Sequence, residues 1–203
     1  TILVLSFCHF SLFAQDTKDI DLWKNDWVLA NNFNMTIDAQ GYEFPSEIAF
    51  IPTPGTGDND PLYFILELNG TLKIVTNDRS SYVFASNFMP VEQPNNKSSV
   101  VGAAGLCLDE KRGYVFVTLA YLDKTSVYRN AIIRFTSKPD GFGLKAETKE
   151  VFTELFSEER SHTSHQIGPC VVKNEQLFVA VGYGTDKNQS QNLNSTLGSI
   201  LRM

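Results

Sequence analysis

Residues 161–184 read SHTSHQIGPCVVKNEQLFVAVGYG and place a polar, histidine-bearing segment directly before two short apolar runs. These runs, residues 170–172 and 177–181, are rich in β-branched and aromatic side chains and flank a polar turn, which is typical of a buried β-hairpin. A loop that leads into a rigid sheet is a common position for reactive side chains. We therefore expect a hairpin here, with His165 at its entrance as the leading candidate for a functional residue.

The same succession of strands and turns occurs twice before this hairpin. Ala49, Cys107 and Cys170 fall at corresponding points of short apolar runs, which gives an internal period of about 60 residues. Four antiparallel strands per repeat at this spacing predict an all-β fold of the β-propeller type, whose third repeat stops after three strands. A small open β-sandwich is the alternative, and the repeat argues against it.

The repeat also leads to two local predictions. Asn69-Gly70 lies between two apolar runs and predicts a two-residue type I′ hairpin turn, because both residues tolerate a positive φ. Cys107 and Cys170 each lie within an apolar strand run, in equivalent strands of different repeats. We expect them to be buried, unpaired thiols, although an exported protein would permit a disulfide.

The N-terminal residues predict export. Residues 1–14 are almost all apolar and carry no Lys, Arg, Asp or Glu, and Gln15-Asp16 then turns polar, as in a signal peptide. The segment is shorter than the roughly 20 apolar residues that cross a bilayer, so we expect no membrane span. Residues 15–43 are interpreted as a lead-in with a first strand at Phe33–Ile37, and residues 44–203 as a partial propeller truncated at its C-terminus. The predicted location is secreted or periplasmic.

The composition excludes some classes of partner. The chain has 203 residues, 42% of them hydrophobic, and a formal net charge of -6, without a run of Lys or Arg. These values indicate a globular protein and argue against a nucleic acid or an anionic membrane surface as partner. A small-molecule substrate or a protein partner remains open.

Several motifs resemble the glucose/sorbosone dehydrogenase family, which includes soluble quinoprotein glucose dehydrogenases and aldose sugar dehydrogenases. The matching segments are His165, Gln166 and Gly168, then residues 176–182, 191–193 and 197–202, and upstream residues 44–50 and 102–106. The resemblance covers about residues 34–203. It implies a six-bladed β-propeller, of which this chain is the N-terminal portion with about three four-stranded antiparallel blades.

The resemblance also implies a chemistry. In the resembled enzymes the histidine matching His165 is the general base on a sugar hydroxyl while hydride passes to pyrroloquinoline quinone (PQQ), a role that suits a group titrating near neutrality. Gln166 would help to bind substrate or cofactor. Most contacts to PQQ and calcium are expected beyond Met203, so no metal ligand is assigned in this chain and this portion alone is expected to be inactive. From the residues alone, a structural histidine hydrogen-bonded at a loop end is the favoured interpretation of His165, and the resemblance makes the catalytic role an equal alternative.

The sequence departs from the family pattern at three places. Pro169-Cys170 replaces Arg-Leu, a valine at position 100 or 101 replaces a polar residue, and Tyr183 replaces an Asp that would orient the histidine. Tyr183 or Asp186 is therefore the candidate orienting group. These departures keep open a non-catalytic extracellular binding propeller, similar to hedgehog-interacting proteins and with a protein partner, and less strongly a lactonase-like propeller.

Overall fold

The computed structural model describes residues 28–90, 101–156, 160–163 and 166–203. The proposed signal peptide, residue Val100 and His165 lie outside the described residues. The chain divides into two compact units, residues 1–38 and 39–203. In the described part of the first unit, residues 28–38, the backbone forms a turn in which the Phe33 N–H donates to the Ala30 carbonyl at 3.1 Å.

The strand predicted around Phe33–Ile37 is not found. Residues 33–44 have no regular secondary structure, and among the described residues no strand pairs with them. The alternation of Phe33, Met35 and Ile37 fits a pleated strand, but a strand also needs a partner that accepts its backbone hydrogen bonds. The alternation alone did not produce a strand here, and Phe33 and Ile37 are 74% and 45% exposed.

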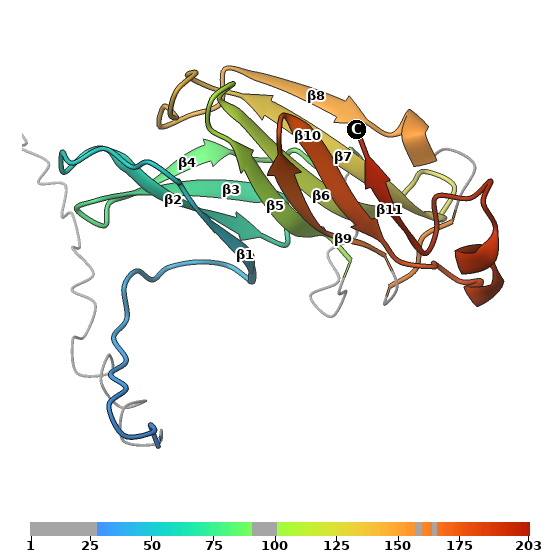
Figure 1. The fold of residues 1–203 in the computed structure, drawn as a ribbon, viewed down its shortest axis with the longest axis horizontal. Coiled ribbons are helices and arrows are strands. Elements are labelled where there is room, and N and C mark those ends of the chain that lie inside the picture. Colours follow the sequence, from blue (N-terminus) through green and yellow to red (C-terminus); the bar gives the residue numbers. More distant parts are fainter. Residues whose placement is uncertain (1–27, 91–100, 157–159, 164–165) are drawn as a thin grey trace, which may run out of the picture. The chain divides into compact units, whose positions relative to one another are not determined.

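The second unit consists of three antiparallel sheets in chain order (Figure 1). We call them blades 1, 2 and 3. Blade 1 contains β1 (Pro45–Phe50), β2 (Pro61–Glu67), β3 (Thr71–Thr76) and β4 (Ser81–Ala85). Blade 2 contains β5 (Ala103–Asp109), β6 (Tyr114–Leu122), β7 (Tyr128–Thr136) and β8 (Thr148–Phe152). Blade 3 contains β9 (Ile167–Lys173), β10 (Gln176–Val181) and β11 (Ser199–Arg202), with β10 in the middle. Three successive sheets confirm the predicted repeat. They also rule out the alternative fold, a sandwich, which has two facing sheets.

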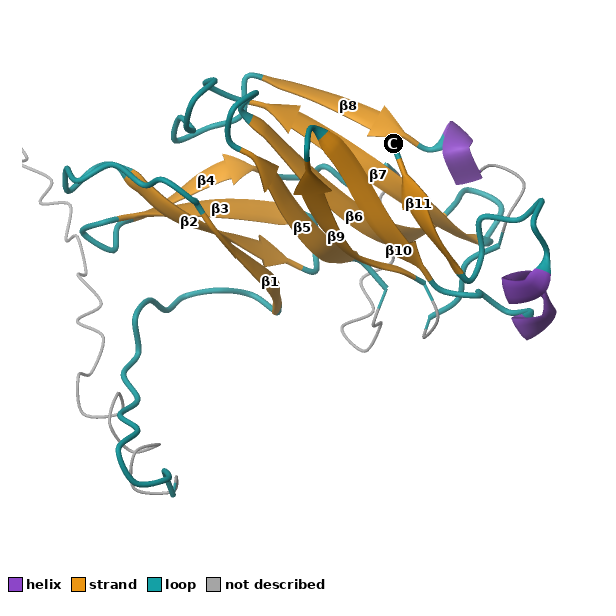
Figure 2. Ribbon diagram, in the orientation of Figure 1, coloured by secondary structure: helices purple, strands orange, loops and turns teal. Residues whose placement is uncertain are grey.

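Helix is limited to short 3-10 turns in the described residues, shown in purple in Figure 2. They are η2 (Glu154–Phe156), after β8, and η3 (Lys187–Gln191), between β10 and β11. Within the described part of the chain, no helix is long and apolar enough to span a membrane.

Apolar side chains join neighbouring blades. Between blades 1 and 2, Phe64 of β2 packs edge-on against Phe142, between β7 and β8, with ring centroids 5.1 Å apart, and against Phe84 of its own blade at 4.9 Å. Between blades 2 and 3, a second buried cluster includes Phe116, Ile132, Phe156, Ile167 and Val179. The middle strands β2 and β6 are covered on both faces, which explains why they are continuous apolar runs and not alternating ones.

The first strand of each blade carries a β-bulge near its start. The register shifts between Pro45 and Glu47 in β1, between Ala103 and Gly105 in β5, and opposite Val179–Val181 in the β9–β10 pair. Pro169 lies in the β9 bulge, where a residue without an N–H breaks no ladder hydrogen bond. This departure from the family pattern therefore has a local structural explanation.

The hairpin predicted at Asn69-Gly70 exists, but its turn is different. Glu67 pairs with Thr71, so the loop has three residues, and the Gly70 N–H donates to the Glu67 carbonyl at 3.1 Å. Of the three, only Gly70 has a positive φ, at 90°. A three-residue loop that ends in a left-handed glycine needs this conformation once, whereas the predicted type I′ turn needs it twice.

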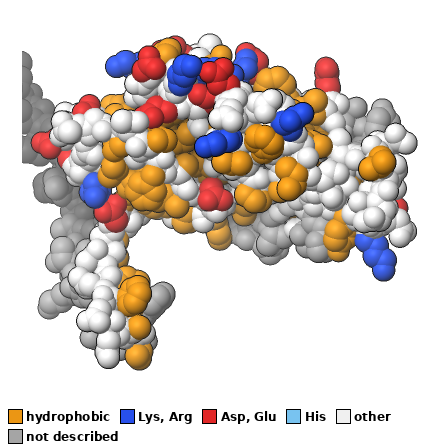
Figure 3. All heavy atoms as spheres, viewed as in Figure 1, with side chains coloured by type: hydrophobic (Ala, Val, Ile, Leu, Met, Phe, Trp, Pro, Cys, Tyr) orange, Lys and Arg blue, Asp and Glu red, His pale blue; other side chains and the backbone are white. Residues whose placement is uncertain are grey.

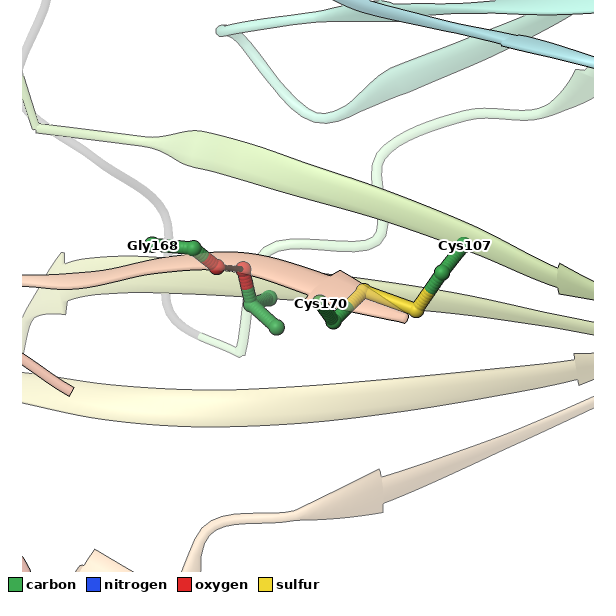
Figure 4. Close-up of a disulfide and its surroundings, with 4 residues drawn as sticks. Cys107, Gly168 and Cys170 are labelled. Carbon is green, nitrogen blue, oxygen red and sulfur yellow. Dashed lines mark hydrogen bonds between the residues drawn. A yellow bond between two sulfur atoms is a disulfide. The ribbon is translucent and has the colours of Figure 1, made fainter. Parts of the chain in front are cut away.

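The prediction of unpaired thiols was wrong. Cys107 and Cys170 form a disulfide, with Cα atoms 5.8 Å apart (Figure 4). Ala49, Cys107 and Cys170 do lie on the first strands of their blades, as predicted. The error was to assume that equivalent strands of different blades do not face each other. β5 and β9 lie side by side, so residues at equivalent heights are close enough to bond.

Candidate functional site

The candidate site lies where the chain enters β9. Here the start of β9 pairs with the end of β10, since Ile167 lies opposite Val181. We call the described residues 160–163, 166–168 and 182–186 the β9 entrance. They belong to two segments, one leading from η2 into β9 and the other leaving β10.

The incoming segment is held by backbone contacts. The Ser161 N–H donates to the Tyr128 carbonyl at the start of β7, at 2.9 Å, and Ser161 is buried. Further along, the Gly182 N–H donates to the Gln166 carbonyl at 3.0 Å. These two bonds attach the segment to blade 2 on one side and to the end of β10 on the other.

Gly184 brings the two segments of the β9 entrance together. Its φ of 63° lies in the left-handed region, and a Cβ at this position would collide with the Arg160 carbonyl oxygen. A residue with a side chain would strain the backbone here and push the segments apart. The glycine is therefore required for the close approach.

His165, the predicted general base, stays a prediction because it lies outside the described residues. Its neighbour Gln166 is half-buried within the β9 entrance. The structure thus fixes the position of the backbone directly after His165. The proposed binding role of the Gln166 side chain also stays a prediction.

The two candidate orienting groups differ in their surroundings. Tyr183 is half-buried and directly follows Gly182, whose N–H bonds the Gln166 carbonyl, so its backbone lies beside the histidine segment. Asp186 is exposed and caps η3, accepting hydrogen bonds from the Asn188 N–H at 3.0 Å and the Gln189 side chain at 3.2 Å. The bond from the Asn188 backbone, then that from Gln189, lowers the pKa of Asp186. Its carboxylate is thus an ionised cap of η3, and which of the two groups orients His165 stays a prediction.

The other departures are placed more simply. Val101 is half-buried just before β5, and Pro169 is exposed in the β9 bulge. His162, half-buried in the β9 entrance, belongs to no cluster that could bind a metal ion: the described residues contain no group of three or more His, Cys, Asp or Glu side chains suited to one.

Two supporting residues escaped the sequence reasoning. Asn130, in β7, is buried, and its side-chain oxygen accepts from the Ile167 N–H at 3.2 Å. Thr118, in β6, is fully buried, and its hydroxyl donates to the Gly168 carbonyl at 2.6 Å. A signal for both residues was present in the sequence, since each is a polar residue inside an apolar strand run. A buried polar side chain needs a hydrogen-bond partner, so each of them could be expected to support a neighbouring segment.

Residues 42–203 match the model of the glucose/sorbosone dehydrogenase family. Among solved structures, the chain is similar to a glucose dehydrogenase, with 18% identity and a TM-score of 0.60 over 80% of this chain and 45% of that one. It is also similar to a putative oxidoreductase (glucose dehydrogenase) from Thermus thermophilus, with 19% identity and a TM-score of 0.56 over 82% of this chain and 46% of that one. The soluble aldose sugar dehydrogenase from Escherichia coli, in its apo-form, gives 14% identity and a TM-score of 0.51 over 79% and 44%. No curated protein matches.

The chain belongs to the glucose/sorbosone dehydrogenase family, because the family match covers most of its length. The similar structures share its all-β, propeller-type fold. The chain spans less than half the length of each of them.

Proposed function

We propose that the whole protein is a secreted or periplasmic sugar dehydrogenase that oxidises an aldose hydroxyl. His165 is the general base that takes the hydroxyl proton, and Gln166 contributes to binding. PQQ, when bound together with calcium, would accept the hydride. The substrate is thus a small sugar, and the cofactor contacts come mainly from parts of the protein beyond Met203.

The observation that carries this proposal is the family match together with the fixed backbone after His165. The match includes the histidine segment, and the two residues that follow His165 are held by hydrogen bonds: the Gln166 carbonyl accepts from the Gly182 N–H, and the Ile167 N–H donates to the Asn130 side chain. A general base has to be held within hydrogen-bond reach of the proton that it removes. The Cys107–Cys170 disulfide supports export, because disulfides persist in oxidising compartments.

A binding propeller without catalysis is the second candidate, and one observation favours it. The family Asp that would orient the histidine is replaced by Tyr183, and the nearby Asp186 carboxylate already caps η3. Without a carboxylate partner, the charged form of a histidine is less stabilised. In this case the same face of the propeller would bind a protein partner.

The test is the oxidation of aldoses by the full-length protein loaded with PQQ and calcium, followed by reduction of an electron-accepting dye. We expect His165→Ala to lower kcat by about 100-fold or more, the usual contribution of a general base, with little change in melting temperature. His162→Ala is the matched control, since His162 lies in the same segment, and it should keep its activity.

Two results would overturn the enzymatic proposal. One is an unchanged rate in His165→Ala, and the other is the absence of PQQ binding by the full-length wild type. Either result would favour the binding propeller.

A further inference from the structure

The start of β9 is held against blade 2 by three side chains from three different strands. Thr118 of β6 donates its hydroxyl to the Gly168 carbonyl at 2.6 Å, and Asn130 of β7 accepts from the Ile167 N–H at 3.2 Å. Cys107 of β5 is bonded to Cys170. Figure 4 shows that the disulfide and the bond to Gly168 act on the same short piece of β9.

The bulge in β9 explains why such support is needed. Val179 pairs with Cys170 and Val181 with Ile167, so Gly168 and Pro169 together lie opposite a single residue of β10. A bulge interrupts the ladder of hydrogen bonds between two strands. At this interruption, the side chains of blade 2 supply partners for the β9 backbone.

The glycines of the 102–105 motif make room for this contact. A Cβ on Gly105 would collide with the Thr118 hydroxyl and the Gly168 carbonyl, while a Cβ on Gly102 would collide with the Leu68 backbone of blade 1. Gly105 thus lets a hydroxyl from β6 reach past β5 to β9. The contact between blades is built into the backbone of β5 and is not a chance approach of surface side chains.

We propose that Thr118, Asn130 and the Cys107–Cys170 disulfide form a clamp by which blade 2 fixes the backbone of residues 166–168, directly after His165. The clamp acts on residues 167–170, directly after the histidine and Gln166. Adjacent Cα atoms are about 3.8 Å apart, so a shift at Ile167 displaces Gln166, the residue bonded to His165. This inference rests on the proposed function only for its catalytic consequence. Thr118 and Asn130 are positioning residues that act through the backbone.

Burial makes the clamp sensitive to small changes. Thr118 is fully buried and Asn130 is 2% exposed, so water cannot readily replace either partner. Misplacing a catalytic group by about 1 Å can cost on the order of 100-fold in rate. Loss of one clamp bond should therefore reduce turnover more than it reduces substrate affinity.

The test compares Thr118→Val with Thr118→Ser in the full-length protein. Thr118→Val keeps the shape but removes the hydroxyl, while Thr118→Ser keeps the hydroxyl. We expect Thr118→Val to speed amide hydrogen exchange at residues 166–168 about tenfold and to lower kcat about tenfold with little change in KM. Thr118→Ser should restore both. Thr118→Ser also covers the case in which Thr118→Val does not fold.

Ser46→Ala is the matched control. The Ser46 hydroxyl donates to the Ala103 carbonyl of β5 at 2.8 Å, a similar bond between blades 1 and 2, away from the histidine segment. This variant should leave both exchange at residues 166–168 and kcat unchanged. Equal exchange at residues 166–168 in Thr118→Val and Ser46→Ala would overturn the clamp. Faster exchange in Thr118→Val alone, in a full-length protein that oxidises no aldose, would support the clamp and refute the proposed function.

Discussion

Gly105 has no space for a side chain, because the backbone of β9 and the hydroxyl of Thr118 occupy that space. We expect Gly105→Ala to destabilise the protein by about 1–3 kcal/mol, the usual cost of overpacking a close contact. The quantity to measure is the free energy of unfolding in urea. Gly143→Ala is the control, because a Cβ at Gly143 meets its nearest atom only at 3.5 Å. Equal stability of the two variants would contradict the close contact at Gly105.

At the scale of residues, the sequence predicted the strand on which a residue lies better than the residues that it contacts. It placed Cys107 and Cys170 correctly on equivalent strands, but strand assignment says nothing of which strands become neighbours in space. It singled out the 102–106 motif without showing that Gly102 and Gly105 face different blades. Partners of buried polar side chains such as Asn130 lie 37 residues away along the chain, a distance that local patterns do not reach.

The loop between β6 and β7 is organised by one carboxylate. Asp123 accepts hydrogen bonds from the Thr125 hydroxyl at 2.7 Å and the Val127 N–H at 3.0 Å, and it pairs with Arg129 at 2.9 Å. The bond from Thr125 first, then those from Val127 and Arg129, lowers the pKa of Asp123 below its ordinary value. The ionised carboxylate therefore ties the end of β6 to the start of β7.

The lowered pKa predicts a pH dependence of stability. A carboxylate whose pKa is lower in the folded state stabilises the fold above its unfolded pKa of about 3.9, and this contribution is lost as the pH falls through the folded pKa. We expect Asp123→Asn to unfold at lower urea concentration than the wild type at pH 7. The difference should shrink as the pH falls below about 4. Asp58→Asn, in an exposed loop, is the control, and a difference for Asp123→Asn that is independent of pH would contradict the prediction.

The disulfide connects elements that are distant in sequence. It joins β5 to β9 across 63 residues, and a cross-link of this span is expected to stabilise the fold by roughly 4 kcal/mol through the unfolded chain. Among the strands of the described residues, β9 has one neighbour within its own sheet, β10. The disulfide thus fixes β9, the strand that follows the histidine segment, to blade 2.

For the whole molecule, the period of the sequence was enough to predict successive antiparallel sheets, because each repeat carries its own strands and turns. The same period predicted a propeller-type arrangement of these sheets, but not the contacts that join neighbouring blades. The contact of β5 with β9, for example, involves a glycine and a buried hydroxyl that no periodicity identifies.

The two outermost blades expose apolar side chains. Ile48 and Phe50 alternate on β1 and are 48% and 62% exposed, and on blade 3 Val171 and Ile200 are 56% and 76% exposed. Figure 3 shows hydrophobic side chains gathered toward the middle of one face, with charged side chains mainly along its upper edge. Exposed apolar side chains gathered in this way are typical of an interface. In the proposed six-bladed protein, neighbouring blades would cover these faces.

This arrangement predicts different behaviour for part of the protein and for the whole. We expect residues 39–203 alone to self-associate and to show no dehydrogenase activity, because the apolar faces of β1 and blade 3 have no covering blade. Introducing Phe50→Glu and Ile200→Glu together should reduce this association, as measured by light scattering at matched concentrations. In the full-length protein the same pair should instead lower the melting temperature, since a charge is costly on a buried face. Leu193→Glu is the control, because Leu193 is a single exposed side chain on a loop and should alter neither quantity. A fully monomeric 39–203 fragment, or a full-length protein that tolerates both glutamates, would show that these faces are not covered by further blades.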